Sequence, residues 1–364
     1  MKISVTLSRT GIVATLAITG IAGGGATQAK ADMVLEQYIN LNAVQNVLWS
    51  AKAPLQRWGM APGSGTGVAA FSGERSEFDS RHPFEQSVWH AFDALGYAKA
   101  PPMAAAPPPT WLYGVNVIGA IDETRSGGVG TSAPSGTVAV DVTKIGIFTT
   151  SDALTFVATG TGIWAHTFGL DINTSAGAGT LAYTNGGFSA DFTTSATWSR
   201  PSALNGGVAP AASSSISYTG NAQYKYDLPY KFYIEPTIGV TYTELYTANF
   251  GTKTGDSTEF HAGARIGTEM MWMTYKIQPQ IAGQVFKNVS QSGILAGAVP
   301  GLPVALVSTD AGLGARGSGR INVIWTPNFS SFLDVHGMGL AGMKTAGFVA
   351  TQTIGGSAGI RYSW

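Results

Sequence analysis

Hydrophobic and polar residues alternate one by one along most of the chain after residue 110. Between residues 188 and 193, for example, Phe188, Ala190 and Phe192 alternate with polar neighbours. Successive side chains of a β-strand point to opposite faces, so this pattern predicts strands that are apolar on one face only. Twelve such strands are predicted, at about 111–123, 136–149, 154–169, 177–183, 188–199, 215–227, 232–248, 258–270, 275–287, 310–326, 331–340 and 351–364.

The predicted connections alternate between short and long. Five of them hold four residues each, at 150–153, 184–187, 228–231, 271–274 and 327–330. The other six hold seven residues or more, at 124–135, 170–176, 200–214, 249–257, 288–309 and 341–350. Outer-membrane barrels have short periplasmic turns and long extracellular loops, whereas a soluble sandwich has no reason to collect its long loops at one end. The pattern predicts an all-β fold, a closed 12-stranded antiparallel transmembrane β-barrel over residues 111–364.

The first 31 residues read as a secretory signal peptide. Lys2 and Arg9 precede an apolar stretch from Gly11 to Ala22, and Ala29-Lys30-Ala31 is a small-x-small cleavage site. An N-terminal membrane anchor is the alternative, but the apolar stretch is short for a membrane span. Cleavage there would leave 18 basic and 21 acidic residues, a net charge of −3. This near-neutral charge does not favour nucleic acid as a partner.

Residues 32–110 form a short helical and Pro/Gly-rich N-terminal region. An amphipathic pattern predicts a helix over residues 33–50, with one apolar stripe that consists of Val34, Tyr38, Leu41, Val44 and Leu48. A Gly/Pro/Ala-rich linker over 53–73 and a second short helix near 84–95 follow. The run PPMAAAPPP at 101–109 favours polyproline II and a stiff spacer. The region can be read as a passenger, a plug or a linker.

Composition is typical of either an extracellular β-protein or an outer-membrane barrel. Charged residues make up 12% of the chain, 48 residues are glycine, and no cysteine is present. An exported chain without cysteine has no disulfides, so hydrogen-bonded ladders and packing must hold it together.

Charged residues of both signs fall at inward positions of the predicted strands. Polar barrel interiors are common, so one reading is that these charges pair with each other and with water. The other reading is a ring that selects permeating solutes or grips a plug. The ring would consist of Glu235, Arg265, Arg316, Arg320 and Arg361.

No catalytic, cofactor or metal site is predicted. The five histidines include His166, His261 and His336 in the barrel, and no strand order places a nucleophile and its base together. His82 and His90 lack metal-ligand spacing on one helix face, and no cysteine is available. We therefore expect no enzymatic activity.

Several segments resemble the autotransporter β-domain, the twelve-stranded translocator barrel of type V secretion. They are YTNGGFSADFTTSATW (183–198), YKYDLPYKFYIEPTIGVTY (224–242), FHAGARIGTEM (260–270), YKIQPQIAG (275–283) and the terminal GIRYSW. The resemblance covers the last 255 residues and implies a location in the outer membrane of a Gram-negative bacterium, in contact with its lipid. It also implies periplasmic chaperones and the barrel assembly machinery as partners, and a C-terminal assembly signal made of Ile360, Tyr362 and Trp364.

The N-terminal region departs from the family pattern. Autotransporters usually carry passengers of hundreds of residues, and a helix directly before the first strand plugs the lumen. Here only residues 32–110 precede the barrel, and the run from Pro101 to Pro109 interrupts the position of that helix. We expect a translocator-like barrel that passively houses or exports a short N-terminal segment. Two alternatives remain: a porin-like channel for small solutes, or a surface structural protein or adhesin that uses loops 200–214 and 288–309. The sequence does not distinguish exposed, plugging and periplasmic positions for residues 32–110, and it leaves their cleavage and the oligomeric state open.

Overall fold

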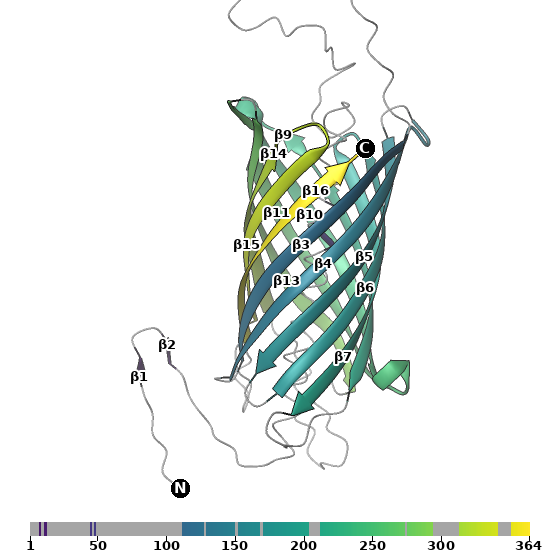
Figure 1. The fold of residues 1–364 in the computed structure, drawn as a ribbon, viewed down its shortest axis with the longest axis vertical. Coiled ribbons are helices and arrows are strands. Elements are labelled where there is room, and N and C mark those ends of the chain that lie inside the picture. Colours follow the sequence, from purple (N-terminus) through teal and green to yellow (C-terminus); the bar gives the residue numbers. More distant parts are fainter. Residues whose placement is uncertain are drawn as a thin grey trace, which may run out of the picture.

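In the computed structural model, the segments in which hydrophobic and polar residues alternate form long antiparallel strands. These strands pair edge to edge into a closed barrel (Figure 1). The first six are β3 (Trp111–Ser126), β4 (Val129–Ile145), β5 (Asp152–Thr167), β6 (Leu170–Asn185), β7 (Phe188–Ala203) and β8 (Ser213–Tyr224). The other six are β10 (Phe232–Thr247), β11 (Lys253–Thr268), β13 (Tyr275–Gly293), β14 (Leu313–Ile324), β15 (Phe329–Leu340) and β16 (Thr351–Ser363). The predicted closed 12-stranded antiparallel barrel is confirmed.

Smaller elements accompany this wall. β9 (Tyr226–Asp227) and β12 (Met270–Trp272) extend hairpins, and the 3-10 turns η3 (Pro229–Lys231) and η4 (Ala248–Phe250) lie in connections. β1 (Leu7–Ser8) and β2 (Gly11–Ile12) pair with each other. The structure describes residues 7–8, 11–12, 44–45, 47–48, 111–126, 129–149, 152–167, 170–203, 212–273, 275–293, 313–340 and 351–364.

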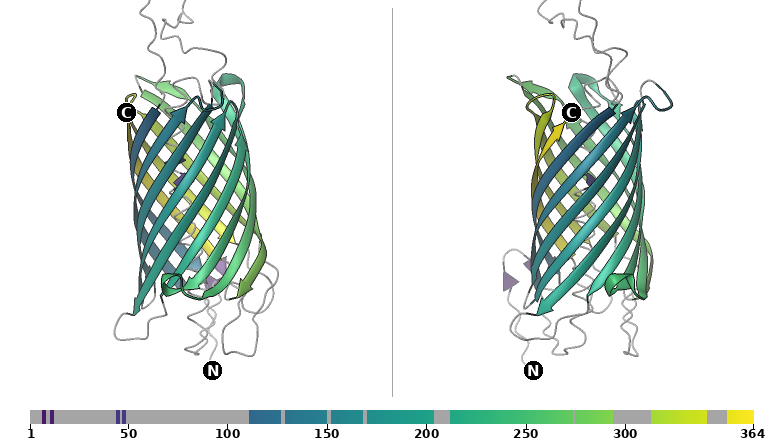
Figure 2. Two further views of the ribbon diagram at one scale, coloured as in Figure 1. Left: turned by 90° about the vertical axis from the view of Figure 1, so that its right-hand side faces the viewer. Right: turned by 45° about the vertical axis from the view of Figure 1, so that its right-hand side comes forward.

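Closure of the barrel brings the first and the last long strand together. β16 pairs with β3 from Thr351↔Ser126 to Ser363↔Gly114. Beyond this ladder, Tyr113 and Trp364 exchange two backbone hydrogen bonds of 3.0 and 3.1 Å. Two views in Figure 2 show the tilted strands wrapping into a continuous wall. A closed wall has no free edge, so it leaves no row of unpaired backbone groups for lipid to solvate.

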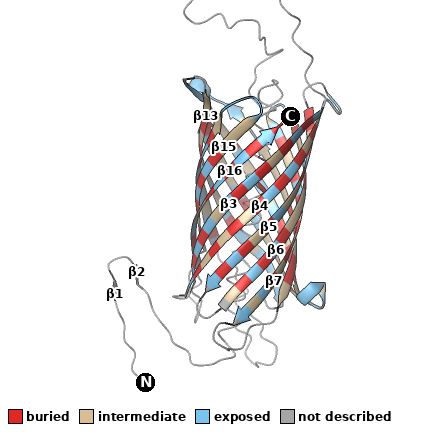
Figure 3. Ribbon diagram, viewed as in Figure 1, coloured by how far each residue is buried: buried red, intermediate tan, exposed pale blue. Residues whose placement is uncertain are grey.

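The two faces of the wall differ in chemistry, and Figure 3 shows buried and exposed residues alternating along the strands. Large apolar side chains are exposed on the outside, for example Val138, Phe192 and Ile360. On the inside, hydroxyl groups pair across neighbouring strands, as in Thr137–Thr161 at 2.8 Å and Thr180–Thr193 at 2.9 Å. An apolar exterior around a hydrogen-bonded polar interior is the arrangement expected of a barrel in lipid.

Short turns join neighbouring strands at one end of the barrel, as predicted. β6 and β7 are joined by Gly186 and Gly187, and Gly186 has a φ of 54°, a conformation that glycine adopts without steric cost. Between β4 and β5, the Asp152 carboxylate accepts hydrogen bonds from the backbone N–H groups of Ile147, Phe148 and Thr149, at 2.7 to 3.1 Å. These hydrogen bonds give the backbone N–H groups of the turn an acceptor.

The prediction that all connections at the other end hold seven residues or more is wrong for three of them. β10 ends at Thr247 and β11 begins at Lys253, so the connection predicted at 249–257 holds five residues. β3 and β4 pair up to Ser126↔Val129, and β5 and β6 pair up to Thr167↔Leu170. The predicted loops 124–135 and 170–176 therefore belong mostly to strands. Hydrophobic alternation fades there because the outward positions carry residues such as Arg125, while backbone pairing continues. The strand predicted at 177–183 likewise runs from Leu170 to Asn185, because its outward positions are small or polar.

Most predictions for the N-terminal region lie outside the described residues. These are the signal-peptide cleavage site, the linker 53–73, the second helix near 84–95 and the spacer 101–109. Of the helix predicted over 33–50, the described residues are Val44, Gln45, Val47 and Leu48, and all four are helical.

Candidate functional site

The inner wall of the barrel has an apolar sector. It is formed by inward-facing Ile118 of β3, Ala139 of β4, Val157 of β5, Ala182 of β6 and Phe332 of β15, all of them buried. These strands are consecutive around the barrel except for β16, which lies between β3 and β15. The apolar sector therefore spans neighbouring strands of the wall. Two further buried apolar clusters also face inward, one that contains Ile163 and Ile172 and one that contains Leu112 and Ile145.

Helical residues of the N-terminal region pack against this apolar sector. Val44, Val47 and Leu48 are 1%, 0% and 4% exposed and form one hydrophobic cluster with the five residues of the sector. Because those five face inward from five strands, the helical residues lie inside the lumen. We call Val44, Gln45, Val47 and Leu48 the helical segment. Each fully buried aliphatic side chain contributes about 1.5–3 kcal/mol relative to water. Val44 and Leu48, on the apolar stripe predicted from the sequence, therefore dock the segment on the wall.

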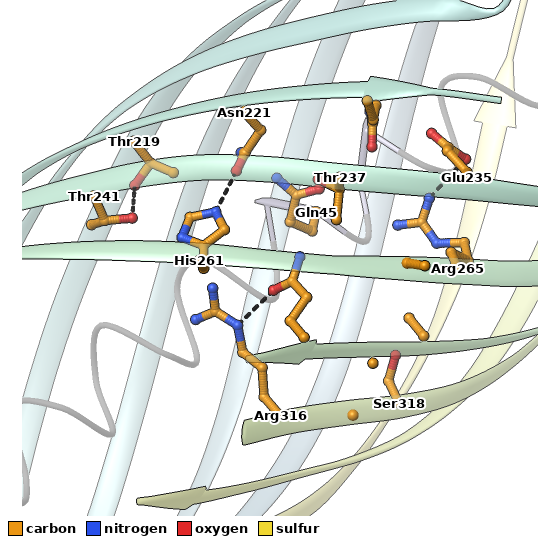
Figure 4. Close-up of a pocket in the computed structure, with 16 residues that line it drawn as sticks. Gln45, Thr219, Asn221, Glu235, Thr237, Thr241, His261, Arg265, Arg316 and Ser318 are labelled. Carbon is orange, nitrogen blue, oxygen red and sulfur yellow. Dashed lines mark hydrogen bonds and ion pairs between the residues drawn. The ribbon is translucent and has the colours of Figure 1, made fainter. Parts of the chain in front are cut away.

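The opposite sector of the lumen is polar, and a cavity of about 140 Å³ remains between it and the helical segment. Gln45, on the same helical turn as Val44, faces this cavity (Figure 4). The charged and imidazole side chains that line it come from β10, β11 and β14 and are Glu235, His261, Arg265 and Arg316. The segment thus has one side on an apolar wall and the other side on a polar space.

The lumen charges predicted from the sequence face inward, and each has a partner. Arg265 lies 3.1 Å from Glu235 on the neighbouring strand. Arg316 donates a 2.7 Å hydrogen bond to Gln284 and lies 3.3 Å from Glu259.

Arg320 and Arg361 complete the set. Arg320 donates to Asn322 at 2.8 Å, and its guanidinium lies 3.9 Å from the ring centre of Phe332. Arg361 donates two hydrogen bonds, of 2.6 and 2.8 Å, to the two carboxylate oxygens of Asp141. A role in selecting solutes or gripping a plug stays a prediction for all five charges.

A buried cluster of His336 with two aspartates was missed from the sequence. The His336 Nδ1 atom lies 2.7 Å from Asp334 Oδ1, and its Nε2 atom lies 2.7 Å from Asp122 Oδ1. From the sequence, His336 was considered only as a catalytic base. Asp141 was also missed. It lies on the same face of its strand as Ala139 and Thr143, so the two-residue alternation predicts that it faces inward.

The residues of the lumen are arranged for hydrogen bonding. Both ring nitrogens of His336 contact carboxylates, so neither is free to activate a nucleophile. The His261 Nε2 atom lies 2.7 Å from the Asn221 side-chain oxygen. His166 pairs with Asp171 at 2.7 Å, near the end of its strand. Across the part of the chain that the structure describes, no group of three or more His, Asp or Glu side chains is arranged to hold a metal ion.

No described helix is long and apolar enough to cross a membrane.

The outward residues predicted as an assembly signal lie along the last strand. Ile360 and Tyr362 are exposed on the outer face of β16, and Trp364 follows them. The Trp364 ring stacks on Tyr362 and on Tyr113 of β3, with ring centres 5.9 and 6.0 Å apart. Their role in assembly stays a prediction.

Comparison with known proteins identifies the fold. Neither a family model nor a curated protein matches the sequence. Among solved structures, the β domain of the Bordetella autotransporter BrkA matches with a TM-score of 0.52 and 12% identity, over 70% of this chain and all of that one. The translocator domain of the autotransporter NalP from Neisseria meningitidis gives 0.47 and 10% identity, over 77% and 94%. An outer membrane channel from Pseudomonas putida F1 gives 0.43 and 9% identity, over 72% and 99%. The chain therefore has the fold of an outer-membrane β-barrel.

Proposed function

We propose that this chain is an outer-membrane translocator-type barrel whose lumen houses a segment of its own N-terminal region. The burial of Val44, Val47 and Leu48 against the apolar sector carries the proposal. A porin that passes solutes through an open lumen has no need for an apolar patch on its inner wall. An apolar patch facing water is unfavourable unless something covers it, and the helical segment covers it here.

Housing this segment would be passive. Lipid surrounds the apolar outer face, hydrogen-bonded strands hold the shape, and docking holds the segment in place. Each ring nitrogen of His336 has one carboxylate partner, so the imidazole is engaged in hydrogen bonding.

Closure of the wall supports one direction of the segment through the lumen. Trp111 begins β3 at the end of the barrel that has the tight turns, which in outer-membrane barrels faces the periplasm. A connection from Leu48 to Trp111 cannot pass through the hydrogen-bonded wall. We propose that it leaves on the periplasmic side, so that the residues before Val44 are directed to the cell exterior, as in export of a short segment.

The polar cavity favours a second candidate, a channel for small solutes. Arg265, Arg316 and Glu235 line a space that the helical segment does not fill. On this view the segment narrows a pore and does not close it, and small polar solutes pass beside Gln45.

Cysteine labelling tests whether the segment is seated as proposed, because the natural chain has no cysteine. We expect Gln45→Cys, which faces the cavity, to react with a small water-soluble thiol reagent in the reconstituted full-length barrel. We expect Val47→Cys, two residues further along on the buried side, to react at least about 100-fold more slowly, since its side chain has no contact with water.

The two positions lie two residues apart, so each serves as the control for the other. Equal, fast labelling of both cysteines in the folded barrel would mean that the segment is outside the lumen. Denatured protein should label equally at both positions, which verifies that the cysteines have the same intrinsic reactivity.

A further inference from the structure

The contact between β3 and β16 differs from every other contact in the wall. Each of the other neighbouring pairs of long strands is consecutive in the chain, so a turn or loop joins the two strands. Where the connection is a tight turn, its geometry fixes the register of the pair. β3 and β16 are the first and the last long strands, and no turn joins them. We call this contact the seam. Side chains must fix its register.

Two buried charged contacts cross the seam, and each passes over one intervening strand. Arg361 of β16 reaches past β3 to Asp141 of β4, with hydrogen bonds of 2.6 and 2.8 Å. His336 of β15 reaches past β16 to Asp122 of β3 at 2.7 Å. Together they join β15, β16, β3 and β4, the four strands centred on the seam.

A glycine makes room for each of these contacts. A Cβ atom at Gly114 of β3 would lie 2.6 Å from the Asp141 carboxylate oxygen and would also collide with the Arg361 guanidinium. A Cβ atom at Gly355 of β16 would lie 2.7 Å from His336 Nε2 and would collide with the Asp122 carboxylate. Both glycines face the lumen in the strand that is passed over, so a long side chain can reach the second strand along.

The seam contacts are more buried than a comparable ion pair within a hairpin. Arg361 and Asp141 are 3% and 0% exposed, and His336 and Asp122 are 2% and 1% exposed. Arg265 and Glu235, which join the hairpin strands β10 and β11, retain 16% and 7%. A buried charge that loses its partner is strongly destabilising, so these contacts discriminate sharply between correct and shifted pairing.

We propose that Arg361–Asp141 and His336–Asp122 form a two-point clamp that closes the seam and sets its register. A shift of β16 by one residue would turn Arg361 towards lipid, and a shift by two residues would separate both pairs. His336 also contacts Asp334 on its own strand at 2.7 Å, which orients the imidazole towards Asp122. The clamp supplies the register information that a tight turn supplies in the short hairpins of the wall.

Unfolding kinetics with engineered disulfides test the clamp. Asp141→Asn leaves Arg361 buried without its counter-charge, and we expect the barrel to unfold in urea about 100-fold faster. We then add Val117→Cys and Ile360→Cys, which are outward-facing Cα partners across the seam. Paired antiparallel residues lie about 4.5–5.5 Å apart, within the range of a disulfide. This disulfide should restore most of the lost kinetic stability, because it replaces the clamp at the seam.

A second disulfide is the matched control. Val240→Cys and Phe260→Cys are outward-facing Cα partners in the hairpin of β10 and β11, on the far side of the barrel. We expect it not to rescue Asp141→Asn, because the seam would still open. Equal rescue by both disulfides would overturn the proposal, and so would unchanged unfolding of Asp141→Asn.

If Asp141→Asn does not fold, Arg361→Lys takes its place. Lysine keeps the charge but cannot form the two parallel hydrogen bonds to the carboxylate. We expect faster unfolding that the seam disulfide corrects and the hairpin disulfide does not. Unfolding of Arg361→Lys at the natural rate would contradict the clamp as well.

Discussion

Deleting Tyr362, Ser363 and Trp364 is expected to abolish insertion of the barrel into the outer membrane. These residues hold the end of the seam: Tyr362 pairs with Val115, Ser363 pairs with Gly114, and Trp364 exchanges two backbone hydrogen bonds with Tyr113. Without them, backbone groups of β3 would remain unpaired at the edge of the membrane, at a cost of several kcal/mol each. The measurement is the amount of folded, heat-modifiable barrel in outer-membrane fractions.

Two point variants serve as controls for this deletion. Trp364→Phe keeps an aromatic ring over Tyr113 and keeps every backbone hydrogen bond, and Ser363→Ala changes one inward side chain only. Both should insert in nearly natural amounts. Insertion of the truncated chain at the natural level would show that the last three residues are dispensable for closing and assembling the barrel.

Removing the docked helical segment is expected to raise the conductance of the barrel several-fold. A chain that lacks residues 33–50 loses Val44, Val47 and Leu48 from the lumen and leaves the apolar sector uncovered. The space they occupied would join the polar cavity beside Gln45, giving a wider water-filled path. Single-channel recording in planar bilayers, on the full-length and shortened proteins, measures the change.

A matched pair of substitutions tests whether docking of the helical segment, and not only its presence in the chain, lowers the conductance. Val47→Asp places a carboxylate against the apolar sector, where an unpaired charge costs several kcal/mol, so the segment should undock and the conductance should rise. Gln45→Glu places the same group in the polar cavity and should leave the segment docked. Conductance that is equal in the full-length, shortened and Val47→Asp proteins would contradict a lumen occupied by this segment.

The sequence is sufficient to predict the barrel because lipid imposes a strict rule on every strand. Phe188, Ala190 and Phe192 alternate with polar neighbours, and such alternation marks which face of a strand meets lipid. All twelve strands were predicted from this pattern. It does not mark where a strand ends. Beyond the apolar band, residues such as Arg125 remain paired in β3 with no hydrophobic signal. The lengths of β3 and β6 were therefore underestimated.

The lumen was only partly predictable for a different reason. Val44 and Leu48 could be placed on one apolar stripe from their helical spacing, but the wall that they contact is assembled from five separate strands. Arg361 was recognised as an inward charge, whereas its partner Asp141 lies two strands away. That contact depends on the tilt of the strands and on the space over Gly114, and neither is encoded in a local pattern.

Spin-label accessibility along one strand tests most directly that the apolar outer face meets lipid and the inner face does not. Single cysteines at Thr137, Val138, Ala139 and Val140 of β4, in a chain without natural cysteine, would carry a nitroxide in the reconstituted barrel. We predict that oxygen, which concentrates in lipid, reaches the labels at Val138 and Val140 and is largely excluded at Thr137 and Ala139. Equal access of a water-soluble nickel chelate to all four positions, with no two-residue period, would contradict the account.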